Sequence, residues 1–137
     1  MAKYKKNNAP SMKYLQNLWR EAVKAVHGSG CALHYLGGCL GEIECHHIVK
    51  RGHGVLTNDW HNGLPLCQNH HNAARQITAR REIERHVDMV YLESMDGWLL
   101  KDYLQKRGIS RAEYLREELE ELKAVIQNPA PYREWLE

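Results

Sequence analysis

The clearest pattern of hydrophobic positions lies near the start of the chain, in residues 11–26. Apolar residues recur there three or four positions apart, as on one face of an α-helix. They are Met12, Leu15, Leu18, Trp19, Ala22, Val23 and Val26. Ser11 is a candidate N-cap, and Gly28 or Gly30 can take a left-handed conformation that ends a helix. The pattern predicts one amphipathic helix that turns a single face toward a core.

From Cys31 to Cys67 no helical period persists, and glycines are frequent. The stretch "GEIECHHIV" predicts a short strand, and "LPL" predicts a second strand or extended piece. The turn-rich stretch "KRGHGVLTNDWHNG" predicts a long loop before "LPL". Pro65 suits the edge or the start of a strand, because it cannot donate a ladder hydrogen bond. We expect a compact ββ region here.

Helical patterns return after Cys67. The stretch "QNHHNAARQ" can begin a helix. The stretch "TARREIERHVDMVYLESM" places Ile83, Val87, Val90 and Tyr91 on one face of a helix. It is followed by "DGWLLKDYLQKRG".

Two further helices are expected toward the end of the chain. The stretch "DGWLLKDYLQKRG" predicts a short helix that is capped by Asp96 and stopped by Gly108. The next helix opens with Ser110 and Glu113, the spacing of a capping box. Its apolar stripe consists of Leu115, Leu119, Leu122 and Ile126. Pro129 and Pro131 end this helix, because proline cannot continue one.

Charge is distributed unevenly along the chain. Residues 1–30 hold six basic residues and one acidic residue, whereas residues 82–137 hold eight basic and thirteen acidic residues. A basic front and an acidic rear are typical of a polyanion-facing surface with a solvated helical back. Residues 1–10 are expected to form a flexible basic arm, although their lysines are equally compatible with an ordinary frayed terminus.

The cysteines and histidines are concentrated in one part of the chain. All four cysteines and seven of the nine histidines lie between Cys31 and His71. No apolar run reaches the ~18–20 residues of a membrane span, and no signal-peptide core is present. We therefore expect a cytoplasmic protein without membrane association, in which disulfides are disfavoured. The cysteines and histidines are then better interpreted as metal ligands.

Two ligand clusters flank the predicted ββ region. Structural zinc takes four Cys or His ligands, usually as two close pairs. Cys67 and His70 form a good second pair. The first pair is Cys31 with Cys39, which we favour because thiolates hold structural zinc strongly, or Cys31 with His34. Unliganded packing in a core is the alternative for the cysteines, and it is our interpretation of Cys45.

Adjacent histidines cannot easily serve one metal as equals. Neighbouring side chains point to opposite faces of a strand and lie ~100° apart on a helix. His70 can therefore face the zinc while His71 faces elsewhere, and His46 and His47 diverge in the same way. We expect His46 and His71 to share a second, catalytic metal, with His47 beside it as general base.

The stretches "ECHHI" and "LPLCQNHH", with Asn62 between them, resemble the HNH endonucleases, which have the ββα-metal fold. They look most like zinc-stapled phage versions of the RecA-dependent nuclease type. The resemblance runs from about Cys31 to Ala74, roughly a third of the chain. Two departures stand out, because His70 takes a position where the family often has Cys and because the first ligand pair, Cys31 and Cys39, is widely spaced.

The resemblance implies a role for each matching residue. It makes His46 and His71 ligands of a catalytic divalent ion, Mg²⁺ or Mn²⁺, and His47 the base that deprotonates the attacking water. It also makes Asn62 an anchor of the loop that helps to orient the base, and we expect a backbone carbonyl to orient the ring of His47. Phosphate contacts are expected from residues around the site. These residues are Lys50, Arg51, His53, His61, Arg75, Arg80 and Arg81. For Lys50, Arg51, His53 and His61 a solvated loop position is the alternative.

The sequence thus predicts an α+β protein with a small ββα-metal HNH core, structural Zn²⁺ and flanking helices. The expected division is a basic arm at 1–10 and one nuclease domain at 11–137. The core of that domain covers about 31–80, and a helical extension covers about 81–137. The expected function is metal-dependent cleavage of DNA, in phage or prophage recombination, repair or processing, with a recombinase or other phage protein as a candidate partner. The alternative is a zinc-bound nucleic-acid-binding module without catalysis.

Overall fold

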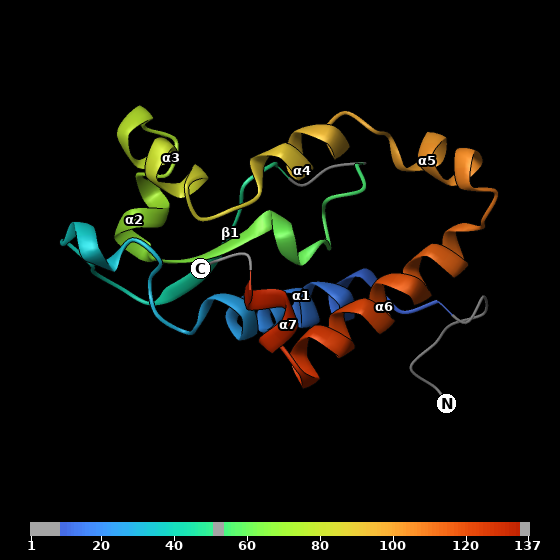
Figure 1. Cartoon of the computed structure of the whole chain (residues 1–137), viewed down its shortest axis with the longest axis horizontal. Coiled ribbons are helices and arrows are strands. Elements are labelled where there is room, and N and C mark those ends of the chain that lie inside the picture. Colours follow the sequence, from blue (N-terminus) through green and yellow to red (C-terminus); the bar gives the residue numbers. More distant parts are fainter. Residues whose placement is uncertain (1–8, 51–53, 135–137) are drawn as a thin grey trace.

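The computed structural model describes residues 9–50 and 54–134 and has the expected α+β class (Figure 1). The strands are β1 (Ile43–His47) and β2 (Gly63–Cys67). The helices are α1 (Met12–His27), α2 (Gln68–Asn72), α3 (Ile77–Glu84), α4 (Met89–Met95), α5 (Leu100–Arg107), α6 (Arg111–Gln127) and α7 (Ala130–Arg133), with short 3₁₀ turns at His34–Leu36 and Trp60–Asn62. The expectations for residues 1–8, Arg51 and His53 lie outside the described residues.

Helix α1 follows the predicted amphipathic pattern. The Ser11 hydroxyl accepts a hydrogen bond from the Tyr14 backbone N–H at 3.1 Å, as the N-cap prediction requires. Gly28 ends the helix with a positive φ of 92°. The buried face includes Leu15, Trp19, Ala22, Val23 and Val26, so this stripe of the sequence is the side that packs.

The two strands pair antiparallel, so each residue of β1 shares a sheet face with its partner in β2. His46 lies opposite Leu64, and His47 lies opposite Gly63. Because side chains alternate along a strand, His46 and His47 face opposite sides of the sheet. Pro65 pairs with Cys45, which is permitted because both strands of a two-stranded sheet are edges.

Two hydrophobic clusters cover the two faces of the sheet. On one side α1 lies beside α6 (Figure 1), and their apolar stripes pack together with Trp60. On the other side, Leu64 and Leu66 of β2 pack against residues of α3 and α4, including Ile83 and Leu92. The short hairpin is therefore stabilised by burial on both sides, since an isolated hairpin is marginal at best in water.

The single helical face expected from residues 78–95 is wrong, because two helices occupy this stretch. Helix α3 ends at Glu84, and the Asp88 side chain caps the start of α4 by accepting from the Tyr91 backbone N–H at 3.1 Å. Val87 is buried between them, but Val90 is 81% exposed. A local cap at Asp88 restarts the helix, so the apolar period does not continue across it.

The ends of α5 and α6 agree with the predicted caps, except at the start of α5. Asp96 lies at the C-terminal end of α4 and does not cap α5, which begins after Leu99 without a side-chain cap. Gly108 ends α5 in the left-handed conformation. Ser110 and Glu113 form the predicted capping box of α6. Within the described ranges, none of the helices has both the length and the apolar character needed to cross a membrane.

Gly63 offers a direct test of the packing between the sheet and α1. A Cβ at this position would lie 2.5 Å from Val23 Cγ2 and 2.7 Å from Trp19 Cζ2. We expect Gly63→Ala to lower the free energy of unfolding by about 1–3 kcal/mol, the usual cost of overpacking. Denaturant unfolding measures this change.

The matched control is Gly30→Ala, because nothing lies within 4 Å of a Cβ there. Its free energy of unfolding should stay within about 0.5 kcal/mol of the wild type, as for other surface changes. Equal effects of the two substitutions would contradict the described packing of α1 on β2.

Candidate functional site

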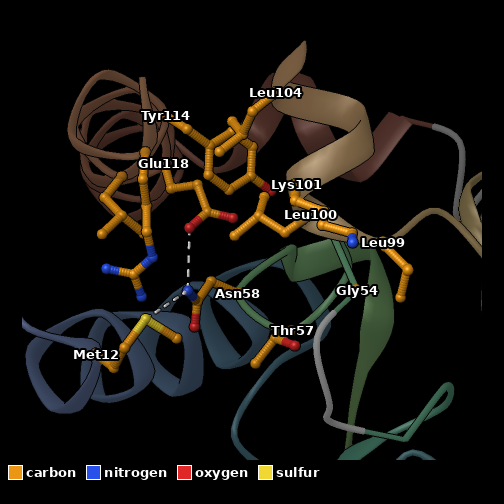
Figure 2. A pocket seen from close by; sticks show the side chains of 12 residues that line it. Met12, Gly54, Thr57, Asn58, Leu99, Leu100, Lys101, Leu104, Tyr114 and Glu118 are labelled. Carbon is orange, nitrogen blue, oxygen red and sulfur yellow. Dashed lines mark hydrogen bonds between the residues drawn. The ribbon is translucent and has the colours of Figure 1, made fainter. Parts of the chain in front are cut away.

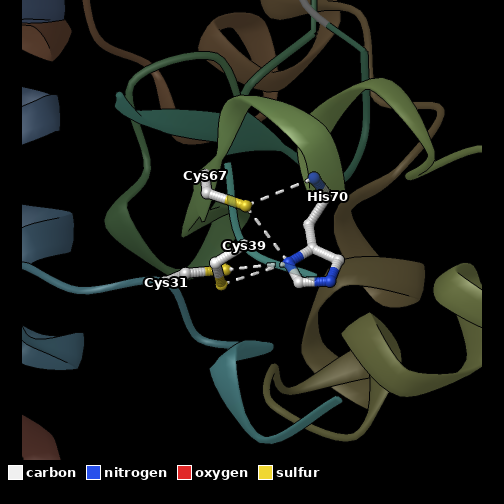
Figure 3. A group of neighbouring side chains, drawn as sticks. All are labelled: Cys31, Cys39, Cys67 and His70. Atoms are coloured by element: carbon white, nitrogen blue, oxygen red, sulfur yellow. Dashed lines mark hydrogen bonds between the residues drawn. The ribbon is translucent and has the colours of Figure 1, made fainter. Parts of the chain in front are cut away.

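Four potential metal ligands from three segments meet at one end of the sheet (Figure 3). Cys31 and Cys39 flank the first 3₁₀ turn, Cys67 ends β2, and His70 lies in α2. Their donor atoms all lie within 4.8 Å of one another. The Nδ1 atom of His70 is 3.3, 3.6 and 3.2 Å from the sulfurs of Cys31, Cys39 and Cys67. The predicted pair Cys67 and His70 therefore lies against the favoured pair Cys31 and Cys39.

Local hydrogen bonds hold the segments that carry the ligands in place. The Cys67 sulfur accepts from the His70 backbone N–H at 3.4 Å, so this cysteine also caps α2. The Asn69 backbone N–H donates to the Leu40 carbonyl at 3.1 Å, and its side-chain amide donates to the Gly38 carbonyl at 2.7 Å. Gly38 has a φ of 79°, a left-handed conformation that favours glycine just before Cys39.

The thiols of Cys39 and Cys67 differ in acidity because their surroundings differ. Burial raises the pKa of Cys39 to about 12, and the thiols of Cys67 and Cys31 add to this shift. Burial also raises the pKa of Cys67, but hydrogen bonds from the backbone N–H groups of His70 and Leu40 and from the other thiols outweigh it. The pKa of Cys67 is consequently lowered to about 6. Cys67 is therefore the more readily deprotonated of these two thiols.

The chemistry of the cluster fits a metal such as zinc. Tetrahedral zinc binds Cys sulfur at about 2.3 Å and His nitrogen at about 2.0–2.1 Å, so its donors lie about 3–4 Å apart. Among the residues that the structure describes, this is the only group of three or more His, Cys, Asp or Glu whose donors converge so closely. His34 is exposed and stands outside the group, as does Cys45. The alternative first pair with His34 is therefore wrong.

A second cluster lies on the face of β1 that carries His46. The rings of His46 and His71 make an edge-to-face contact with their centroids 5.1 Å apart. The Nδ1 atom of His71 lies 2.6 Å from a carboxylate oxygen of Glu44. Burial, with smaller contributions from His71 and Arg75, lowers the pKa of His46 to about 4. His46 is therefore neutral near pH 7, the form that binds metals.

The sequence prediction did not include Glu44. Strand alternation could have found it, because residues two apart on β1 share a face and Glu44 is two residues before His46. A carboxylate on one ring nitrogen fixes the orientation of a metal-binding histidine and leaves the other nitrogen for the metal. The 5.1 Å between the ring centroids of His46 and His71 lies in the usual range for paired aromatic rings.

His47 lies on the opposite face of the sheet, toward α1. Its ring stacks on Trp19 with centroids 3.9 Å apart and an interplanar angle of 6°. Its Nε2 atom lies 3.1 Å from the backbone carbonyl oxygen of Thr57. A backbone carbonyl thus contacts the ring of His47. It belongs to Thr57, for which the sequence predicted no role.

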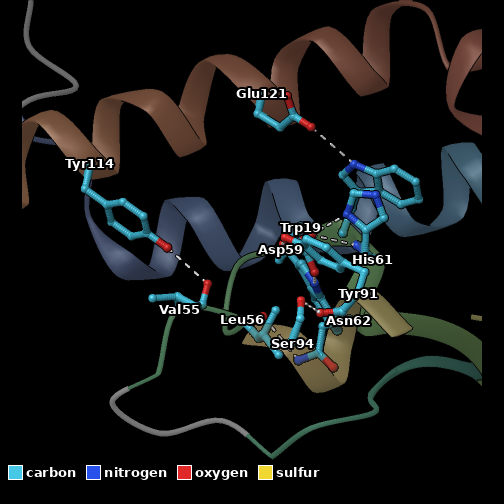
Figure 4. A network of polar contacts seen from close by, with 11 residues as sticks. Trp19, Val55, Leu56, Asp59, His61, Asn62, Tyr91, Ser94, Tyr114 and Glu121 are labelled. Atoms are coloured by element: carbon cyan, nitrogen blue, oxygen red, sulfur yellow. Dashed lines mark hydrogen bonds and ion pairs between the residues drawn. The ribbon is translucent and has the colours of Figure 1, made fainter. Parts of the chain in front are cut away.

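Asn62 is fully buried and ties together two parts of the connection between the strands. Its side-chain oxygen accepts from the Val49 backbone N–H at 2.7 Å, and its amide nitrogen donates to the Val49 carbonyl at 3.0 Å. The same nitrogen donates to the Leu56 carbonyl at 3.1 Å. Asn62 therefore anchors Val49, just after β1, to Leu56 in the connection to β2. Figure 4 shows Asn62 beside Leu56.

A cleft of about 380 Å³ opens beside His46. Three of the predicted phosphate contacts, Lys50, Arg75 and Arg80, line it. Carboxylates line it as well, including Glu93 and Glu84, which pairs with Arg80 at 3.5 Å. The cleft therefore presents both positive and negative charge around His46.

His61 lies in another part of the molecule (Figure 4). Its Nδ1 atom is 2.7 Å from the Asp59 carboxylate, and its ring stacks on Trp60 with centroids 3.7 Å apart. The pocket beside it, of about 280 Å³, is lined by carboxylates that include Glu117 and Glu121. Because carboxylates repel phosphate, these surroundings do not favour the phosphate contact expected for His61.

Comparison of the chain with protein-family models, with curated proteins and with solved structures finds no match. The chemistry proposed for the chain therefore rests on its own residues and their arrangement.

Removal of one thiol tests the metal centre. Elemental analysis of the wild type should find about one zinc ion per chain, the stoichiometry of one tetrahedral site. We expect Cys67→Ser to lose this zinc and to lower the free energy of unfolding by about 4 kcal/mol or more, as loss of a metal site does. Cys45→Ser is the matched control and should keep its zinc. A wild-type protein that folds normally without zinc would rule out the assignment.

Proposed function

We propose that the protein is a metal-dependent DNA endonuclease that hydrolyses phosphodiester bonds. In this proposal its ββα unit is an HNH core held by structural Zn²⁺. The observation that carries the proposal is the arrangement at the end of β1. His46 and His71 are paired on one face, and His47 at the last position of the strand contacts a backbone carbonyl. These are the residue types and contacts that a one-metal, histidine-base mechanism requires.

His47 is the general base in this mechanism. The Thr57 carbonyl can only accept a hydrogen bond, so the neutral ring carries its proton on Nε2 and its lone pair on Nδ1. That nitrogen takes a proton from a water molecule, whose oxygen then attacks the phosphorus. The bond from phosphorus to the 3′ oxygen breaks as the new bond forms. Stacking on Trp19 keeps the ring in one plane.

His46 and His71 would hold the catalytic divalent ion, with Glu44 orienting the ring of His71. The ion supplies stabilisation of the charge that develops on the phosphate and on the leaving oxygen. Two imidazole ligands suit a transition-metal ion, whereas Mg²⁺ prefers oxygen ligands. Of the two ions expected from the sequence, Mn²⁺ therefore fits this ligand set better.

Positive side chains in the cleft would bind the DNA backbone. Arg75, Arg80 and Lys50 lie beside His46 and can contact phosphates without reading sequence. His61 is left out of this surface because of its acidic surroundings. The resemblance to phage nucleases favours phage or prophage DNA in the bacterial cytoplasm as the substrate, and a recombinase or another phage protein as a partner.

A plasmid-nicking assay with Mn²⁺ or Mg²⁺ tests the catalytic proposal. We expect wild-type protein to nick DNA, and we expect His47→Ala to cut about 10²–10⁴-fold more slowly, the usual contribution of a general base. His34→Ala removes an exposed histidine near the metal centre and should leave the rate unchanged.

Failure of the wild type to cut any single- or double-stranded DNA would overturn the enzyme proposal. If such a protein still bound DNA, the non-catalytic zinc module would be the better description. Cleavage by His47→Ala at the wild-type rate would instead remove only the assignment of the base.

Salt dependence of DNA binding tests the phosphate contacts. Each phosphate contact contributes about −0.9 to the slope of log affinity against log salt for duplex DNA. We expect Arg75→Ala to weaken DNA binding and to reduce the magnitude of this slope by about 0.9, the contribution of one phosphate contact. Arg85→Ala is the control, because Arg85 pairs with Glu82 and lies outside the cleft. Equal effects of the two substitutions would contradict the placement of DNA in the cleft.

A further inference from the structure

The Thr57 carbonyl that contacts His47 is also held by a side chain of α1. This oxygen accepts a hydrogen bond from Gln16 Nε2 at 3.0 Å, in addition to its 3.1 Å contact with His47 Nε2. Gln16 is only 8% exposed and lies on the otherwise apolar buried face of α1. A buried amide needs hydrogen-bond partners. Gln16 finds them in the segment that carries Thr57, so α1 determines where this carbonyl lies.

A series of hydrogen-bonded side chains continues from Gln16 to α6. The Gln16 amide also donates to the side-chain oxygen of Asn58, which is 3% exposed. Asn58 in turn donates to the Glu118 carboxyl at 3.0 Å (Figure 2). Burial raises the pKa of Glu118 to about 7, although the hydrogen bond from Asn58 opposes that shift. This hydrogen bond joins the segment that carries Thr57 to α6.

The neighbouring carbonyls of this segment are held in the same way. Tyr114 of α6 donates to the Val55 carbonyl at 3.0 Å, and Trp19 of α1 donates to the Asp59 carbonyl at 2.9 Å. Connecting segments usually lie at the surface and are mobile. Here side chains from two helices determine the backbone position on both sides of Thr57 (Figure 4).

We propose that Gln16 is a positioning residue for His47, because it holds the Thr57 carbonyl that orients the ring. This inference rests on the proposed role of His47 as general base. A carbonyl that is fixed in place selects the ring tautomer with its proton on Nε2, and in this tautomer the lone pair of the base is on Nδ1. Gln16 lies outside residues 31–74, where the chain resembles HNH enzymes. Helix α1 is therefore part of the catalytic arrangement as well as part of the core.

Gln16→Met tests this role, because it keeps the length of the side chain and removes the donor. In the nicking assay we expect kcat to fall about 10-fold to 100-fold, the cost of a misplaced catalytic group. The KM for DNA should not change, because Gln16 is buried away from the cleft. Gln105→Met makes the same substitution at an exposed position of α5 and should change neither constant.

A spectroscopic measurement separates positioning from a general loss of structure. Long-range ¹H–¹⁵N NMR spectra report which ring nitrogen of His47 carries the proton. The wild type should show the Nε2–H tautomer, and folded Gln16→Met should show a mixture of both tautomers. If Gln16→Met does not fold, Gln16→Leu replaces it. Leucine also lacks the N–H donor, and the same changes are expected.

Two results would overturn the proposal. The first is a folded donor-free variant with the wild-type kcat and the wild-type ring spectrum. The second is a lower kcat with an unchanged ring spectrum, because Gln16 would then act by another route. If the wild type does not cut DNA, the proposed function fails, but the ring spectrum still decides whether Gln16 sets the tautomer of His47.

Discussion

The protein depends on holding together a hairpin that is too small to be stable alone. Strands β1 and β2 have five residues each, and two such strands in water form at best a marginal structure. Hydrophobic clusters cover both faces, and the Cys31, Cys39, Cys67 and His70 donors meet where β2 leads into α2. A metal bound there would join the chain before β1 to the chain after β2. Such a crosslink would add to the free energy that burial on both faces supplies to so small a sheet.

Once the hairpin is held, strand alternation gives the two adjacent histidines different surroundings. His46 faces α2, where its ring contacts His71, and Glu44 contacts His71 in turn. His47 faces α1, where it contacts the Trp19 ring and the Thr57 backbone carbonyl. The two neighbours therefore share no contact partner among these residues. A one-residue shift of register would exchange the two faces, so the close fit of Gly63 against α1 also protects the site.

The sequence predicted best those features that depend on neighbours along the chain. The apolar stripe of α1, the Ser110–Glu113 capping box and the left-handed Gly108 all occur as expected, because each signal acts within a few residues. The prediction failed at residues 78–95. There the Asp88 cap and the burial of Val87 between two helices interrupt a pattern that alone looks continuous. The prediction that Asp96 caps the start of α5 was wrong, because Asp96 lies at the C-terminal end of α4. A residue type that caps helices can occur at either end of one.

The sequence alone determined which residues can carry chemistry. The spacing of Cys67 with His70 predicted a shared metal site, and the adjacent histidines at 46–47 and 70–71 predicted side chains that point apart, as neighbours on a strand or helix do. Only the tertiary structure decided that Cys39 and not His34 completes the cluster, that Glu44 supports His71, and that Thr57 and Gln16 lie behind His47. These contacts join segments up to about forty residues apart, and the pairing of β1 with β2 and the packing of α1 on one face of the sheet bring them together. No local pattern encodes such contacts, because they join residues that are distant in the sequence.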